Sequence, residues 1–397
     1  MGTSSLQPVD SSLKRQDQAA ASLPDPEFDL LCACCARSPA DRNPRIHAAL
    51  REPLAWQKLA SSAEHHGLVP RLYEVLLANS ALFPQPGLAV VRRLYASNLR
   101  RALWLTRELG RVLAHLDARR IPALPFKGPS LAQRLYGDVS ARQFFDLDIL
   151  IRADDFARAQ AALLELGFQP GMKLSAREQR SHLETGNEFT FDSQNGRCPL
   201  ELQWRIAPRF YSVDFDVPGL FTRAGTLPLA GITIPSLASE DLLLILCAHA
   251  WKHAWIQLSL FCDIADLADR EKPDWSAVWQ QASALGLSRV VAVTFLVAHR
   301  LLGAPLPPGL RPDSTARQLA EQVLALIRRS APPSGEHLLE YFKLTASARE
   351  RTRDRTRFWW RLATTPGAGE WSVVRLPGPL FPLYRIIRLG RVARWLF

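Results

Sequence analysis

The stretch QFFDLDIL, residues 143–150, places two aspartates, Asp146 and Asp148, one residue apart in an otherwise apolar run. An unpaired carboxylate in an apolar environment is costly. Successive side chains of a β-strand alternate between its two faces, so both aspartates project from the same face. The residues beside them project from the other face and are expected to enter the core: Phe145, Leu147 and Ile149. The run therefore predicts a strand whose carboxylate face opens onto a cleft.

The two carboxylates of this strand lie about 7 Å apart and repel each other unless a cation lies between them. Hard divalent ions such as Mg²⁺ prefer carboxylate oxygens and share them with substrate phosphates. Asp146 and Asp148 are therefore candidate ligands for Mg²⁺, with Mn²⁺ as the alternative ion. The competing interpretation is a pair of solvent-facing aspartates on an edge strand.

The segment before this strand carries a candidate phosphate-binding turn. IPALPF, residues 121–126, is a short apolar run that ends in KGPS, and a helix-like pattern follows. Gly128 permits close approach of the backbone, and a helix N-terminus offers unpaired N–H groups to a phosphate. Lys127 can add a charge and Ser130 a hydroxyl. Arg142 can face a phosphate or pair with an aspartate, and the sequence leaves both readings open.

A third carboxylate follows in the segment NEFTFDSQNGRCPLELQWRI, residues 187–206. Two alternating runs flank Asn195 and Gly196, which is a strong hairpin signal. Glu201 lies in the second run, with Gln203 on the same face of the expected strand. The pattern predicts that Glu201 joins the two aspartates from a neighbouring strand.

The chain divides into segments of different texture, and its fold class is predicted to be α+β. Residues 27–115 and 236–330 show helical periodicity, whereas residues 116–235 alternate strand, helix, strand and helix before the hairpin. A small mixed-sheet module flanked by N- and C-terminal helical segments is expected. Residues 1–26 are polar, rich in Ser and Pro, and expected to be disordered. Residues 331–397 form a basic, aromatic-rich tail.

The positive charge of the chain is concentrated in that tail. The net charge is +11, and residues 341–397 hold 12 Lys and Arg against 3 Asp and Glu, so the rest is close to neutral. The segment 382–397 resembles a basic amphipathic helix. Such a helix lies on an anionic membrane surface, binds nucleic acid, docks onto a protein partner or packs on its own body. Nucleic acid is the less favoured partner, because a basic composition is confined to this one segment.

The cysteines and the apolar runs bear on location. Three of the six cysteines, Cys32, Cys34 and Cys35, lie in one helix-like apolar stretch and the other three are scattered, which argues against a zinc site or a disulfide framework and favours reduced, mostly buried thiols. The N-terminus lacks the apolar core of a secretion signal, and no apolar run is long enough to span a membrane. A cytoplasmic location is expected, with a peripheral membrane contact through the tail as the alternative.

Three stretches resemble a known family: FKGPSLAQRLYGDVSARQFFDLDILI (126–151), LELQW (200–204) and EDLLLILCAHAWKHAWIQLSLFCDIADL (240–267). They are similar to bacterial nucleotidyltransferase-family proteins of the DNA polymerase β-like superfamily, over about residues 28–300. In that superfamily a glycine-containing turn holds the nucleotide's phosphates, and a DxD pair with a third acid binds the metal ions.

Carried onto this chain, the resemblance assigns Gly128 and Ser130 to the phosphate turn and Asp146, Asp148 and Glu201 to the metal ions and to catalysis. Two departures stand out. The usual Gly-Ser or Gly-Gly turn is interrupted by a proline at position 129, and the third acid is a Glu where an Asp is commoner.

The resemblance further implies that Lys252 and His253 line the cleft from the helical segment; the alternative is an ordinary packed helix. The implied reaction transfers a nucleoside monophosphate from an NTP to a hydroxyl or phosphate of a biosynthetic intermediate, a small molecule, peptide or glycan precursor, and releases pyrophosphate. Glu201 or Asp148 is the expected proton acceptor. The alternatives are a catalytically silent or antitoxin-like nucleotide-binding protein, and a transferase acting on tRNA.

Overall fold

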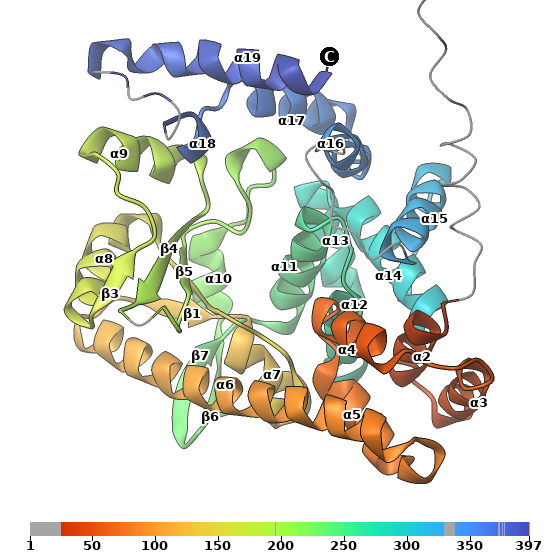
Figure 1. The fold of residues 1–397 in the computed structure, drawn as a ribbon. Coiled ribbons are helices and arrows are strands. Elements are labelled where there is room, and N and C mark those ends of the chain that lie inside the picture. Colours follow the sequence, from red (N-terminus) through yellow and green to blue (C-terminus); the bar gives the residue numbers. More distant parts are fainter. Residues whose placement is uncertain are drawn as a thin grey trace, which may run out of the picture.

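The computed structural model describes residues 25–194, 196–328, 338–371, 374, 376 and 378–396. Most of the segment predicted to be disordered, residues 1–24, and Asn195 of the predicted hairpin turn lie outside these residues. Figure 1 shows a sheet module beside a bundle of helices, with the C-terminal helices lying across the top of both.

The N-terminal part is helical, as its periodicity predicts. Its elements are α2 (Pro26–Cys34), α3 (Pro39–Ala49), α4 (Trp56–His65), α5 (Val69–Ala78), the 3₁₀ turn η1 (Ser80–Leu82) and α6 (Gln85–Ala118). Proline stands in the first turn of α2, α3, α5 and α6, where its missing N–H has no helical partner to lose. The 34-residue helix α6 runs along the base of the sheet module (Figure 1).

The sheet module follows. Its strands are β1 (Ala123–Pro125), β2 (Leu147–Ile151), β3 (Phe168–Pro170), β4 (Glu188–Ser193) and β5 (Leu200–Gln203). The connecting elements are α7 (Gly128–Tyr136), η2 (Val139–Ala141), η3 (Ala153–Asp155), α8 (Phe156–Glu165) and α9 (Ala176–Thr185). The strand order is β1-β2-β5-β4-β3, with β2 parallel to β5 and the other neighbours antiparallel. The predicted hairpin is β4–β5, and the α+β prediction with a mixed sheet is confirmed.

The alternation in the opening stretch begins later than the sequence suggests. Leu147 and Ile149 are completely buried, as predicted. The prediction that Phe145 enters the core is wrong, because its side chain is 51% exposed and lies under the guanidinium of Arg101, 4.4 Å from the ring centroid. The physical reason is that β2 starts at Leu147, so strand alternation does not reach back to this phenylalanine. The preceding Phe144 is buried in its place.

A short hairpin leads from the sheet module into the second helical part. The segment begins with η4 (Arg209–Tyr211) and α10 (Val217–Arg223), and the hairpin itself consists of β6 (Gly225–Leu229) and β7 (Ile232–Ser236). The second helical part comprises α11 (Ser239–Lys252), α12 (Leu258–Glu271), α13 (Trp275–Leu285), α14 (Ser288–Leu302) and α15 (Ser314–Arg328). Residues of α2, α4 and α5 share one hydrophobic core with α11 to α15, although they are far apart in sequence. A second core joins α6, the sheet and α8.

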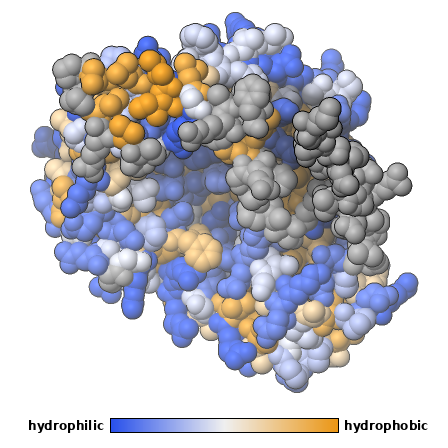
Figure 2. Space-filling model, turned by 45° about the horizontal axis from the view of Figure 1, so that its top comes forward, coloured by the Kyte–Doolittle hydropathy of each residue, from blue (hydrophilic) through white to orange (hydrophobic). Residues whose placement is uncertain are grey.

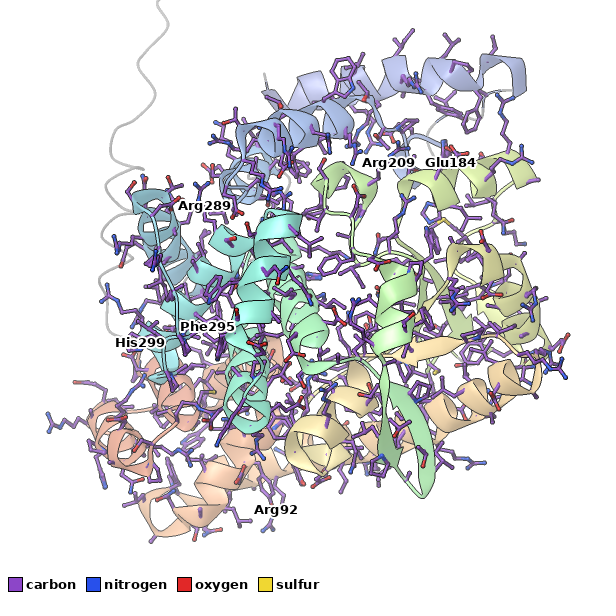
Figure 3. All side chains as sticks on the ribbon, turned by 180° about the vertical axis from the view of Figure 1, so that it is seen from behind. Arg92, Glu184, Arg209, Arg289, Phe295 and His299 are labelled. Carbon is purple, nitrogen blue, oxygen red and sulfur yellow. The ribbon has the colours of Figure 1, made fainter. Side chains whose placement is uncertain are left out.

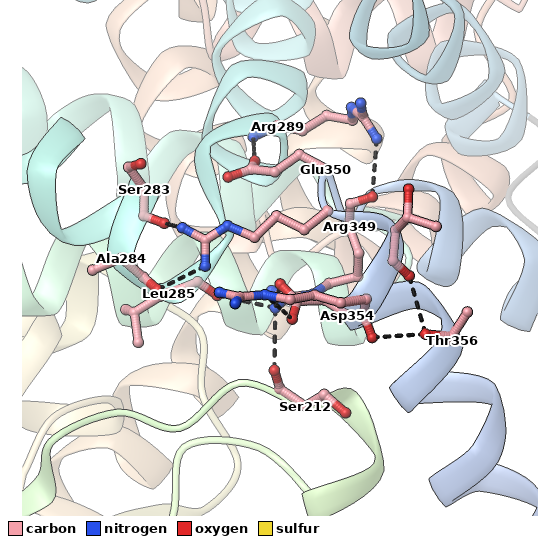
Figure 4. A network of polar contacts seen from close by, with 12 residues as sticks. Ser212, Ser283, Ala284, Leu285, Arg289, Arg349, Glu350, Asp354 and Thr356 are labelled. Atoms are coloured by element: carbon pink, nitrogen blue, oxygen red, sulfur yellow. Dashed lines mark hydrogen bonds and ion pairs between the residues drawn. The ribbon is translucent and has the colours of Figure 1, made fainter.

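The C-terminal part comprises α16 (Leu338–Ser347), α17 (Thr352–Thr364), α18 (Ala368–Trp371), η6 (Gly378–Leu383) and α19 (Tyr384–Leu396). Arg349, which is 1% exposed, fastens it to the body (Figure 4). Its Nη2 donates to the carbonyl oxygens of Ser212 and Leu285, at 3.1 and 3.0 Å, and to Asp354 Oδ2 at 3.1 Å. The indole of Trp251 in α11 donates to the carbonyl of Thr345 at 2.9 Å. The beginning of the C-terminal part thus packs on the body. The segment 382–397 falls largely in α19, which contacts other C-terminal helices: Arg388 Nε donates to the carbonyl of Leu362 in α17 at 2.9 Å.

None of the helices in the described residues is long and apolar enough to cross a membrane. All six cysteines are buried and unpaired, as the sequence predicts.

Candidate active site

Two of the three predicted metal ligands face each other across parallel strands. Asp148 of β2 and Glu201 of β5 are register partners. The side-chain amide of Gln203 donates to Asp148 Oδ1 and to Glu201 Oε2, both at 3.0 Å. One amide therefore bridges the two carboxylates and holds them on the same face of the sheet.

The predicted phosphate turn lies at the start of the same strand. Gly128 has a φ of +55°, and a Cβ added there would lie 3.0 Å from the carbonyl oxygen of Asp146, so the turn needs glycine. Ser130 Oγ donates to the carbonyl of Lys127 at 2.9 Å and so braces the turn itself. The ammonium of Lys127, which is almost buried, lies 2.5 Å from Asp148 Oδ1. The structure thus brings the turn and the two aspartates into direct contact.

Negative charge exceeds positive charge in this cluster. Burial, and then the neighbouring Asp148, raise the pKa of Asp146 to about 6. Burial, Asp148 and Glu188 raise the pKa of Glu201 to about 7. The pKa of Lys127 is raised as well, because the attraction of Asp148 and the other acids outweighs its own burial. These three acids share one lysine, which leaves room for a further cation.

Glu188 is a fourth acid at this site that the sequence reasoning missed. It stands in β4 opposite Gln203, and its Oε2 lies 3.3 Å from the ammonium of Lys252 at the end of α11. The signal was present in the hairpin, because Glu188 shares the alternating face of the strand that pairs with the one holding Glu201. The predicted cleft residue Lys252 therefore does reach the sheet.

His253 lies directly after α11, and its ring is 4.5 Å from that of His249. Loss of hydration among the surrounding protein atoms, followed by the charges of Lys252 and Lys127, lowers the pKa of His253 to about 4. Part of its side chain still reaches solvent. The imidazole is therefore neutral at pH 7 and offers a hydrogen bond rather than a charge.

Arg142 pairs with an aspartate, one of the two readings left open, but the partner is neither of the strand aspartates. Its guanidinium reaches Asp263 Oδ2 of α12, with Nη2 at 2.9 Å and Nε at 3.0 Å. Asp263 also accepts a long hydrogen bond from the hydroxyl of Tyr136, at 3.4 Å. The pair joins the segment before β2 to the helical core and so fixes where that strand begins.

Within the described part of the chain, no three His, Cys, Asp or Glu residues stand in ready-made metal-binding geometry. The ammonium of Lys127 and the amide of Gln203 both contact Asp148 Oδ1, and the same amide contacts Glu201 Oε2. The donor set nevertheless fits Mg²⁺, because it consists of carboxylate oxygens, and like charge raises the pKa of two of those carboxylates.

A comparison of the sequence with protein families decides the identity of this module. Residues 52–303, more than half of the chain, match the model of a family described as "uncharacterised nucleotidyltransferase". The chain belongs to this nucleotidyltransferase family. The family resemblance and the enzyme class predicted from the sequence are thereby confirmed, and the nucleotidyltransferase acts by transferring a nucleoside monophosphate.

Solved structures show more distant likenesses to this nucleotidyltransferase. One is the antibiotic-resistance factor ANT(2'')-Ia, with 14% identity, a TM-score of 0.34 and coverage of 49% of this chain and 97% of that chain. Another is an antigenic nucleotidyltransferase-like protein from Paracoccidioides brasiliensis, with 15% identity, a TM-score of 0.28 and coverage of 47% and 91%. No curated protein matches the sequence. Both likenesses are too distant to assign a substrate.

Proposed function

We propose that this nucleotidyltransferase is Mg²⁺-dependent, that Asp146, Asp148 and Glu201 hold the ion, and that the acceptor is a hydroxyl or phosphate of a biosynthetic intermediate. The observation that carries the proposal is the pairing of Asp148 with Glu201 across parallel strands, directly beside the glycine turn. A small molecule, a peptide and a glycan precursor all remain within the proposed acceptor class.

The residues of the site take the following proposed roles. The backbone of the turn at Gly128, with Lys127 and Ser130, receives the phosphates of the NTP. An acceptor oxygen attacks the α-phosphorus, the bond to the β-phosphate oxygen breaks, and pyrophosphate leaves. Glu201, or Asp148 beside it in register, takes the acceptor's proton. Bound Mg²⁺ supplies neutralisation of the phosphate charge.

Three further residues are proposed to act at the edge of the site. Lys252 and the neutral His253 contact the nucleotide from the end of α11. The ion pair between Lys252 and Glu188 of the sheet supports this role. Arg142 supports the nucleotide's phosphates with positive charge from its fixed position beside Asp263. Its guanidinium is already held by a carboxylate, so it is preorganised.

The test is transfer of label from each α-labelled NTP, in the presence of Mg²⁺ and a cell extract as the source of acceptor. Wild type is expected to label a product with at least one NTP, and Asp146→Asn to label it about 10²–10⁴-fold more slowly. Asp154→Asn is the matched control, because this exposed aspartate lies in the same module outside the site. Equal labelling by wild type and Asp146→Asn contradicts the proposal.

The tail and the location are part of the proposal. We infer a cytoplasmic enzyme, supported by six unpaired buried thiols. A peripheral membrane contact draws support from exposed apolar side chains on α17 and α19, with Trp360 70% and Ile386 63% exposed. Figure 2 shows apolar residues gathered on the face where the C-terminal helices lie. A tRNA acceptor draws no support from a specific contact, and the shared carboxylate site favours an active enzyme over a silent one.

A further inference from the structure

Four arginines gather where the sheet module meets the C-terminal helices. Arg205 lies two positions after β5 and Arg209 begins η4, whereas Arg357 and Arg361 come from α17. These four residues are called the arginine cluster. Arg361 Nη1 donates to the carbonyl of Arg209 at 3.0 Å, which ties α17 to the segment after β5. Arg205 Nη1 donates to the carbonyl of Glu184 in α9 at 2.8 Å. Figure 3 shows Arg209 and Glu184 near each other below the C-terminal helices.

The cluster holds more positive than negative charge: its four arginines are neighboured by two acids, Asp214 and Glu184. Among the described residues, no carboxylate forms an ion pair with any of its four guanidinium groups, and their recorded hydrogen bonds go to carbonyl oxygens and one hydroxyl. Burial, with repulsion from the other arginines, lowers the pKa of Arg361, while Asp214 opposes that effect. In Figure 2 the hollowed surface below the C-terminal helices is hydrophilic. Such a site attracts an anion.

The strand register places the cluster on the far side of the catalytic acids from the phosphate turn. Antiparallel pairing of β1 with β2 brings Lys127 and Gly128 to the beginning of β2. Parallel pairing of β2 with β5 puts Arg205 beyond the opposite end, two residues after Gln203. Arg205 lies four positions after Glu201, so their Cα atoms are at most about 14 Å apart. A nucleotide with its phosphates at the turn leaves the cluster to the second substrate.

We propose that the arginine cluster binds a phosphate group of the acceptor, so that the acceptor is a phosphorylated small molecule whose reacting oxygen reaches Glu201. Arginine forks match the oxygens of phosphate, and several arginines suit its double charge. Arg357 and Arg361 belong to α17, beyond the residues that match the family, so the C-terminal helices complete the acceptor site. This inference rests on the proposed function and narrows its acceptor class.

The experiment measures binding of inorganic phosphate to the full chain by calorimetry, with Mg²⁺ and a non-hydrolysable NTP analogue filling the nucleotide site. Wild type is expected to bind phosphate, and Arg209→Gln and Arg361→Gln to weaken it about tenfold each. Asp214→Asn is expected to tighten it. Arg92→Gln on α6 is the matched control, because this exposed arginine lies far from the cluster (Figure 3).

Several outcomes overturn the inference. They are phosphate binding that survives in the Arg209→Gln/Arg361→Gln double variant, equal weakening by Arg92→Gln, and binding of RNA with a steep salt dependence in place of phosphate. Arg209 is exposed, and its side chain has no hydrogen-bond partner among the described residues, so its replacement is expected to leave the fold intact, which an unchanged Tm verifies. The readout needs no turnover, so loss of nucleotidyl transfer alone rejects the proposed function and leaves this result standing.

Discussion

Two buried clusters of charge in this protein are built in opposite ways. Around Asp263 and Asp266 of α12, every carboxylate meets an arginine: Arg142 reaches the first, and Arg37 and Arg71 reach the second. At the candidate active site, only Asp148 pairs with a cation, Lys127, whose charge also acts on Asp146 and Glu201 from further away. In the first cluster each acid is neutralised by an arginine, and these ion pairs hold helices together. The second is left short of positive charge, which is the condition for binding a cation.

The largest expected effect comes from breaking an ion pair of the first cluster. Asp263→Ala leaves the guanidinium of Arg142 buried without its partner, and we expect a loss of about 3–5 kcal/mol in the free energy of unfolding, measured in urea. Asp269→Asn is the control on the same helix. Its carboxylate is 58% exposed, and its loss should cost less than about 1 kcal/mol. Equal costs for the two variants would remove the distinction between the clusters.

The opposite sign is expected in the second cluster. Glu201→Gln keeps the oxygen that accepts from Gln203 but removes one of the repelling charges. Without Mg²⁺ at pH 8 the variant should be more stable than wild type by about 1–2 kcal/mol, since the raised pKa marks an unfavourable charge. Its transferase rate should fall at least about 10²-fold. A variant that loses both stability and activity would show that Glu201 is structural.

The smallest expected effect is a pH dependence of Mg²⁺ binding at the candidate active site. The metal-free fold holds protons on Glu201 and Asp146 below their pKa values of about 7 and 6, both raised, so its stability from these groups falls as pH rises through that window. Mg²⁺ must displace these protons. Below the pKa of each group, every displaced proton weakens Mg²⁺ binding by up to about tenfold for each unit by which the pH falls. The Mg²⁺-induced rise in Tm should be largest at pH 8 and small at pH 5.5. A rise independent of pH contradicts the assignment.

The sequence was sufficient to predict candidate site residues where reactive side chains lie in a stretch with clear strand alternation. The alternation around Asp148 and the hairpin carrying Glu201 each follow from neighbours within a few residues, and the structure places the two acids in register. The start of β2 could not be read, because Phe145 has the apolar character of a core residue and only the fold leaves it outside.

Contacts between segments that are distant along the chain could not be predicted from the sequence. Asp263 stands 121 positions from Arg142, and Arg361 stands 152 positions from the carbonyl of Arg209. Nothing in the local composition selects these partners among the many arginines and aspartates of the chain. Such pairings are fixed by how whole helices pack, which is why the proposed acceptor side of the site could be recognised only from the structure.

The anchoring of the C-terminal helices has a consequence for biosynthesis. The hydroxyl of Tyr341 donates to the carbonyl of Lys252 at 2.6 Å, and the indole of Trp251 donates to the carbonyl of Thr345. During translation these two partners leave the ribosome after every helix of the bundle they cover. The end of α11 is therefore uncovered while the C-terminal helices are still being synthesised. A chain that is truncated before Tyr341 would keep this surface exposed.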